Sequence, residues 1–207
     1  MNLRALCFAA PALLALPASA QLLNGGFEDP GLGFKSVASG ATYGNWTNGG
    51  PSGIEFVHAI PSGSLPGLEF SAYEGSYWID LVGTASPSSI YQDVVTVPGT
   101  QYEISFAYAG NPYSGAQIMN MDALWNGAIQ GSYSHNTAGH SGPDMGWTVY
   151  SFVVTGTGSD RLMFRGTSGS AAAGPALDAV TMTIVPAPGT LALASLLGLA
   201  GARRRRA

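Results

Sequence analysis

The stretch QYEISFAYAG, residues 101–110, decides the fold of this 207-residue chain. Its bulky side chains recur at every second position, at Tyr102, Ile104, Phe106 and Tyr108, with smaller or polar residues between them. A period of two is typical of a β-strand that buries one face, because successive side chains point to opposite sides of a strand. Turn-forming Pro-Gly and Asn-Pro pairs bound the run. We therefore expect a half-buried strand here.

The same alternation recurs along the chain, and glycine- and proline-rich turns separate the runs. No stretch between residues 21 and 185 shows a long apolar period of 3.6 residues with helix caps. Many short strands joined by such turns predict an all-β protein, here a single jelly-roll β-sandwich. Long loops, where binding sites often lie, are expected at 31–53 and 136–146. The other alternating runs are SYWIDLVG (76–83), IYQDVVTV (90–97), WTVYSFVVT (147–155), RLMFRG (161–166) and LDAVTMTIV (177–185).

Residues 1–20 have the layout of a secretory signal peptide. Arg4 lies near the start, an apolar run follows at residues 5–16, and a small Ala-Ser-Ala triplet precedes a cleavage site after Ala20. Cys7, the only cysteine, lies in this segment, so an exported mature chain has neither a disulfide nor a thiol nucleophile. We expect the folded domain to span residues 21–185.

The chain ends with PAPGTLALASLLGLAGARRRRA, residues 186–207. Its uncharged run, residues 191–202, is shorter than the roughly 20 apolar residues that a membrane-spanning helix needs. Because positive residues stay on the cytoplasmic side, we expect a tail that inserts in the inner membrane with its arginines inside. The alternative is an ordinary C-terminal helix packed on the domain.

The charge of the domain differs from that of the whole chain. Residues 21–185 hold three basic side chains and all twelve acidic ones, a formal charge of −9, because the other basic residues lie in the two end segments. Nucleic-acid binding depends on Lys and Arg that neutralise phosphates, so this domain is not expected to bind nucleic acid or an anionic membrane surface.

The tail resembles the PEP-CTERM sorting signal of Gram-negative bacteria. The resemblance rests on Pro186, Ala187 and Pro188, the short apolar run, and the arginine cluster at Arg203, Arg204, Arg205 and Arg206. Ala187 stands where that family usually has Glu. The resemblance implies export, recognition by an exosortase-type enzyme that removes the tail, and delivery to the cell surface or the extracellular matrix.

Five motifs in order resemble the choice-of-anchor C family over residues 22–185. They are LLNGGFEDP, YEGSYWIDL, IYQDVVTVPGTQYEISFAYAGNP, WTVYSFVVTG and GPALDAV. That family is similar to a plant cell-wall domain of unknown function and, more remotely, to galactose-binding-like carbohydrate modules. The resemblance implies a jelly-roll fold and residence at the surface or in the matrix, without an established reaction.

Two carboxylates at opposite ends of the domain form a candidate calcium site. The first and last strands of a jelly roll lie side by side, so we expect Glu28 and Asp178 to converge. Calcium takes 6–8 oxygen ligands, which two carboxylates and loop carbonyls supply in part. The resemblance to carbohydrate modules also implies a structural calcium here, although Ala179 stands where the family commonly has a second acid. In the alternative interpretation, Glu28 caps backbone amides and Asp178 hydrogen-bonds a neighbouring loop.

Exposed aromatic residues are candidate glycan contacts, because an aromatic ring stacks on a sugar and still presents a polar edge to water. Trp46 lies in the polar segment YGNWTNGG, Trp78 alternates out of phase with its apolar neighbours, and Tyr113 lies in a loop after Asn-Pro. The alternative is core packing, which we expect for Trp147, whereas Trp125 is ambiguous.

Catalytic and metal motifs are weak in this sequence. A glycosidase needs two carboxylates across a cleft, and the pairs Glu69 with Glu74 or Glu55 with Asp80 are the only nominations. His135, His140 and His58 are expected to be solvated or packed. The sequence therefore predicts a non-catalytic protein that binds exopolysaccharide or has a structural role in the envelope or biofilm. A self-associating matrix protein without a glycan ligand and a polysaccharide hydrolase remain as alternatives.

Overall fold

A computed structural model describes residues 22–28, 34–59, 70–83, 87–169 and 173–186. The expected signal peptide and the sorting tail from Ala187 onward, including Pro188 and the four terminal arginines, lie outside these ranges. Pro186 is the last described residue and is exposed. Within these ranges, no helix has the length and apolarity needed to cross a membrane.

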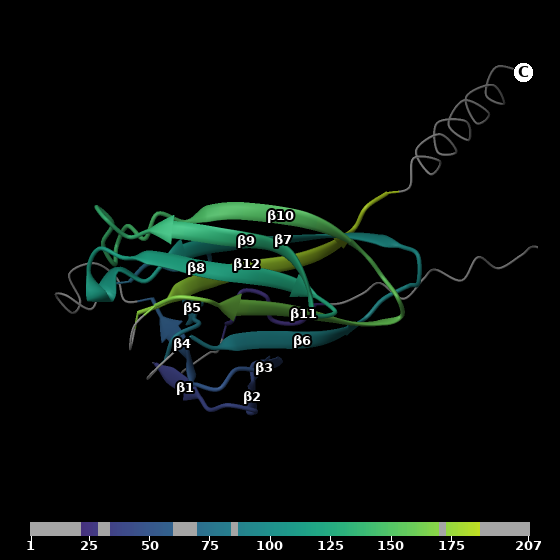
Figure 1. Ribbon diagram of the computed structural model, residues 1–207, viewed down its shortest axis with the longest axis horizontal. Coiled ribbons are helices and arrows are strands. Elements are labelled where there is room, and N and C mark those ends of the chain that lie inside the picture. The colour runs from purple at the N-terminus through teal and green to yellow at the C-terminus, as the bar shows by residue number, and fades with distance from the viewer. Residues whose placement is uncertain (1–21, 29–33, 60–69, 84–86, 170–172, 187–207) are drawn as a thin grey trace, which may run out of the picture.

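The described residues form two six-stranded antiparallel sheets that pack face to face (Figure 1). The first, named the β7 sheet, has the order β1-β4-β5-β12-β7-β10, and the second, named the β8 sheet, has the order β2-β3-β6-β11-β8-β9. The expected all-β jelly-roll sandwich is thus confirmed. The strands are β1 Lys35–Val37, β2 Thr42–Tyr43, β3 Trp46–Asn48, β4 Ile54–His58, β5 Tyr77–Asp80, β6 Ser89–Val95, β7 Gln101–Gly110, β8 Ile118–Trp125, β9 Ala128–Asn136, β10 Thr148–Thr155, β11 Ser159–Gly166 and β12 Pro175–Ile184, with a 3-10 helix η1 at Pro112–Ser114.

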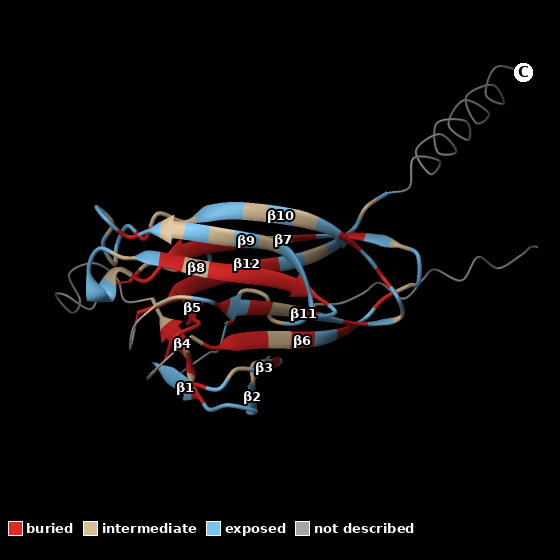
Figure 2. Ribbon diagram, viewed as in Figure 1, coloured by how far each residue is buried: buried red, intermediate tan, exposed pale blue. Residues whose placement is uncertain are grey.

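The alternating runs predict the core correctly. Tyr102, Ile104, Phe106 and Tyr108 of β7 all point between the sheets and are buried there. The inward residues of β5 and β6 join them, and the interior strands are accordingly the most buried in Figure 2. Burial of these large side chains, each worth about 1.5–3 kcal/mol, is the main source of stability for a domain whose residues 21–185 hold no cysteine to form a disulfide.

Segment 31–53 is more regular than the sequence predicts. Its described part holds three short strands, β1, β2 and β3, instead of one irregular loop. Strands of two or three residues are too short to show alternation, which is why this region reads as a loop in the sequence. The second expected loop, after β9, is confirmed.

The two ends of the domain meet at a β-bulge in β12. The pairing of β12 with β7 shifts between Asp178 and Thr181, and Ala179 in the bulge has φ of 50°. The Val180 amide donates to the Gly25 carbonyl at 2.9 Å, and a Cβ on Gly25 would lie 1.8 Å from the Val180 carbonyl oxygen. Only glycine allows this approach, so the N-terminal segment and the last strand lie side by side, as expected.

Candidate functional site

Two loops cover part of the outer face of the β7 sheet and build a second, smaller core. The loop before β5 and the loop before β10 are joined where the Ser71 amide donates to the Gly142 carbonyl at 2.9 Å and the Trp147 indole N–H donates to the Ser71 carbonyl at 3.1 Å. Beneath these loops lie apolar side chains from four strands and both loops: Val57, Phe70, Trp78, Ala109, Met145 and Ala176. The loops are therefore packed onto the sheet and hold their residues in fixed positions.

Tyr73 and Trp147 form an aromatic patch on top of this small core. Their ring centroids are 6.4 Å apart at 66°, and Trp147 in turn contacts the buried ring of Trp78 with centroids 6.2 Å apart. Tyr73 is 46% exposed and Trp147 is partly buried, so both present surface to solvent while their inner edges are supported. An aromatic pair held in this way offers a preorganised apolar surface for a ligand.

Trp46 and Trp78, two of the three aromatic residues expected to contact a glycan, are fully buried. Trp46 is a core residue of β3, where its ring packs on Phe27 and its indole N–H donates to the Asn24 carbonyl at 2.8 Å. Trp78 does point away from the main core, as its phase predicts, but the two loops cover it. The expected exposure of both rings is therefore wrong, and neither presents a free face to a sugar.

Tyr113, the third expected contact, is 57% exposed in η1. The Asn111 side chain caps this helix by accepting from the Tyr113 amide at 3.0 Å. The patch residues Tyr73 and Trp147 were missed. The signal for Trp147 was present in WTVYSFVVT, because Tyr150, Phe152 and Val154 face inward and Trp147 lies on the opposite parity.

Asp178 and Glu28 hold the loop before β5 from two sides. Asp178 Oδ2 accepts from the Tyr73 and Glu74 amides at 2.8 and 3.1 Å, and Glu28 Oε1 accepts from the Ser76 and Tyr77 amides at 2.7 and 3.1 Å. Burial raises the pKa of Asp178 to about 7 against these hydrogen bonds, and the nearby Glu74 carboxylate raises it further. The geometry matches the alternative in which both carboxylates bind backbone amides.

A calcium ion would need more oxygen donors than these two side chains supply. Among the described residues no three His, Cys, Asp or Glu side chains are grouped to hold a metal ion. The calcium site at Glu28 and Asp178 stays a prediction.

Asp80 and Glu55, nominated as a hydrolase pair, are cross-strand partners on β5 and β4. Asp80 is fully buried, and its carboxylate accepts from the Val82 amide at 2.7 Å, the Asn111 side chain at 2.7 Å and the Gly174 amide at 3.3 Å. Burial raises the pKa of Asp80 to about 7. A fully buried carboxylate whose oxygens bind these groups fixes loops and does not face a substrate. Glu69 of the other pair lies outside the described residues.

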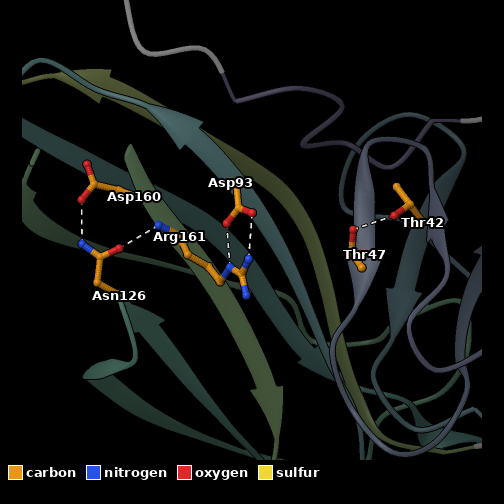
Figure 3. Close-up of polar contacts among 6 residues, drawn as sticks. All are labelled: Thr42, Thr47, Asp93, Asn126, Asp160 and Arg161. Carbon is orange, nitrogen blue, oxygen red and sulfur yellow. Dashed lines mark hydrogen bonds and ion pairs between the residues drawn. The ribbon is translucent and has the colours of Figure 1, made fainter. Parts of the chain in front are cut away.

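The outer face of the β8 sheet is built from polar pairs (Figure 3). Arg161 donates to both Asp93 oxygens at 2.6 and 2.7 Å and lies 3.8 Å from the centre of the Tyr91 ring. Asn126 links this strand to Asp160, because its side chain donates to Asp160 at 2.6 Å and accepts from the Arg161 amide at 2.8 Å. The Arg161 guanidinium therefore covers one face of the Tyr91 ring, which is then not open for stacking.

The fold and the site together define a jelly-roll β-sandwich with an aromatic patch on the outer face of the β7 sheet. A sequence profile described as "Protein of unknown function (DUF642)" matches residues 20–183. The chain belongs to this family. No curated protein matches the chain.

Several solved carbohydrate-binding modules have a similar shape. A family 61 module in complex with β-1,4-galactotriose is 19% identical, with 68% of this chain and 88% of that chain covered and a TM-score of 0.46. A family 22 xylan-binding domain from Paenibacillus barcinonensis is 18% identical, with 74% and 94% covered and a TM-score of 0.46. A family 36 module in complex with calcium and xylotriose is 16% identical, with 55% and 85% covered and a TM-score of 0.38. At these identities the similarity concerns the general shape of the sandwich.

Proposed function

We propose that this domain is a non-catalytic carbohydrate-binding protein and that the patch of Tyr73 and Trp147 is its ligand contact. The observation that carries the proposal is the exposed aromatic pair, supported from below by Trp78 and fixed by hydrogen bonds between two loops. Pyranose rings stack on such side chains, and the rigid support lowers the entropy lost on binding.

A neutral polysaccharide fits this surface better than an acidic one. The domain has a formal charge of −9, Glu74 directly follows Tyr73, and Asp178 lies beneath the same loop. Like charges across an interface cost affinity, so uronic-acid or sulfated polymers would be repelled. A neutral exopolysaccharide is therefore the proposed partner.

Pull-down and calorimetry with neutral polysaccharides, first galactan and xylan, test this function on the full chain. We expect Tyr73→Ala and Trp147→Phe to weaken binding at least about tenfold, and Val95→Ala, an exposed substitution on β6 away from the patch, to leave it unchanged. If Tyr113→Ala abolishes binding and Tyr73→Ala does not, the ligand contact is at η1. Failure of every neutral glycan to bind would overturn the proposal.

One observation favours a second function, self-association as a matrix protein. Strand β10 is the edge of the β7 sheet, carries no charged residue, and exposes Val149 and Val153. Natural edge strands are usually protected by charges or proline, so an unprotected edge favours strand pairing between copies. Sedimentation of the full chain over a concentration series tests it. Oligomers that disappear in Val153→Lys would support this function, and a monomer at all concentrations would exclude it.

The end segments complete the proposal. We propose that residues 1–20 direct export, that the tail at residues 186–207 inserts transiently in the inner membrane, and that an exosortase-type enzyme releases the domain to the cell surface or extracellular matrix. The intact mass of the secreted protein tests both ends. Loss of residues 1–20 and of the tail supports the proposal, and an untrimmed chain in the cytosol contradicts it.

We also propose a structural calcium ion that Glu28 and Asp178 would hold beside Glu74. Such an ion would screen the carboxylates that fix the loop carrying Tyr73.

A further inference from the structure

Two imidazole rings meet at the end of the sandwich where β9 stops. His135 is near the end of β9, and His140 follows a tight turn in which the His140 amide donates to the Thr137 carbonyl at 3.1 Å. Gly139 in this turn has φ of 83°. The ring centroids of His135 and His140 are 5.1 Å apart and their planes are tilted by 37°. The turn therefore converts a spacing of five residues into direct contact.

Two glycines provide the space for these rings. A Cβ on Gly110 would lie 3.1 Å from His135 Cδ2, and a Cβ on Gly146 would lie 2.3 Å from His140 Cε1. Gly110 is the last residue of β7, and Gly146 lies just before β10, the strand that pairs with β7. A side chain at Gly146 would displace the His140 ring, and one at Gly110 would press on Thr137, Met119 and the His135 ring.

Each ring has a buried nitrogen that the protein does not use. Within the described part of the chain, three buried side-chain nitrogen or oxygen atoms have no hydrogen-bond partner, and two of them are His135 Nε2 and His140 Nδ1. An unsatisfied buried polar group costs about 1–3 kcal/mol, so two on adjacent rings need a common explanation.

The ring spacing suits a shared metal ion. Imidazole nitrogen binds zinc or copper at about 2.0–2.1 Å, so two rings that bind one ion at a tetrahedral angle have centres about 5 Å apart. The observed 5.1 Å agrees with this value. Met119 is the cross-strand partner of His135, and its Cγ would lie 2.9 Å from the same Gly110 Cβ that approaches His135, so its thioether is close to the pair. Two imidazoles with a thioether are a donor set that copper prefers.

We propose that His135 and His140 bind one late first-row transition-metal ion, copper in the first place, with Met119 beside them. The ion would satisfy both buried nitrogens at once and would fix the loop after β9 to the end of β7. The site is distinct from the aromatic patch, and its occupancy does not depend on glycan binding.

The test is metal titration of the full chain in a Cys7→Ser background, since Cys7 is the only thiol. Calorimetry with Cu²⁺, with Cu⁺ under reductant and with Zn²⁺ is expected to give one ion per chain. His135→Gln and His140→Gln should each weaken binding at least about tenfold, since each removes one of two imidazole ligands. His58→Gln is the matched control, because this third histidine lies on β4 against Tyr77 and should leave binding unchanged. Met119→Leu should weaken Cu⁺ binding more than Zn²⁺ binding.

Nitrogen NMR of the unmutated chain makes the test independent of variant folding. Metal addition should shift the His135 Nε2 and His140 Nδ1 resonances to values typical of metal-bound nitrogen. The resonances of the other two ring nitrogens should keep values typical of nitrogens that bind no metal. Absence of binding by all three ions would mean that water satisfies the nitrogens and would overturn the proposal. Equal loss of binding in His58→Gln, or binding that survives the double His135→Gln, His140→Gln variant, would overturn it as well.

Discussion

The outer faces of the two sheets are built from the same alternating pattern, yet they differ in chemistry. On the β7 sheet, loops cover the outward residues Trp78, Asp80 and Asp178, and burial raises the pKa of both carboxyls to about 7. On the β8 sheet, the outward Asp93 and Asp122 pair with arginines that hold their pKa values below the usual range, in Asp122 against the opposing effect of burial. Alternation along a strand fixes which side chains point outward. Whether an outward side chain is then buried or exposed depends on whether a loop covers it.

The contrast between covered and uncovered outward side chains is tested by removing one of each kind. Of the changes proposed for the two sheets, loss of a covered aromatic ring should have the largest effect on the free energy of unfolding. We expect Trp78→Ala to lower the free energy of unfolding by about 3–5 kcal/mol, because the ring is fully buried under the two loops. Met163→Ala, at an outward and only partly buried position of β11, should cost about 1 kcal/mol or less. Urea denaturation measures both, and similar losses would show that the loops do not form a core.

The sequence predicts well which face of its sheet a strand side chain points to. It predicts poorly which of the outward side chains are covered by a loop. The inward positions of β5, β6, β7 and β10 follow from alternation, because each strand is long enough to show its period. Alternation also placed Trp78 on the outer face, but the covering loops come from residues 70–74 and 140–147, whose approach depends on long-range hydrogen bonds. Trp46 was misjudged because a three-residue strand has no visible period.

The candidate site follows the same division. The convergence of Glu28 and Asp178 was predicted from jelly-roll topology, and the structure joins both to one loop. The pairing of Tyr73 with Trp147 was not predicted, since it brings together residues more than seventy positions apart that share no motif. Such contacts depend on how loops pack, which a single sequence does not encode in any local pattern.

The pH dependence of stability separates the two faces. Asp80 and Asp178 have folded-state pKa values near 7, above their unfolded value, so their protonated forms stabilise the fold and this stability is lost as the pH rises from about 4 to 7. We expect unfolding free energy to fall by on the order of 5 kcal/mol between pH 5 and pH 8, with about half of this from each carboxyl. Asp93 and Asp122 have lowered pKa values and act in the opposite direction, with loss of stability below about pH 4.

Urea titrations at successive pH values measure this profile. Asp178→Asn should roughly halve the slope between pH 5 and pH 8, because Asp80 still contributes, whereas Glu103→Gln, an exposed control on β7, should leave the slope unchanged. A stability that rises steadily from pH 5 to pH 8 would contradict the assignment of buried, protonatable carboxyls to the β7 sheet.

Calcium addition tests the role of Glu28 and Asp178, the carboxylates that hold the loop before β5 on the β7 sheet. If Glu28 and Asp178 hold an ion, calcium at about 100 times its dissociation constant should stabilise the fold by about 2.7 kcal/mol relative to excess EDTA. Thermal unfolding measures the shift, and Glu28→Gln should remove it because the variant keeps an amide acceptor but loses the charge. Identical melting curves with calcium and EDTA would mean that Glu28 and Asp178 bind only the backbone amides of the loop and hold no calcium ion.

The smallest expected effect concerns the ion pairs of the β8 sheet. In the Arg161–Asp93 pair both side chains are about half exposed, at 44% and 57%, so a double-mutant cycle to alanine should give a coupling of about 0.2–1 kcal/mol that weakens with salt. The Arg165–Asp122 pair should couple more strongly, because the Asp122 side chain is only 11% exposed and also accepts from Ser132. Thermal and urea unfolding of the single and double variants measure both cycles. Equal couplings for the two pairs would mean that partial burial on this face, unlike loop coverage on the β7 sheet, has no energetic consequence.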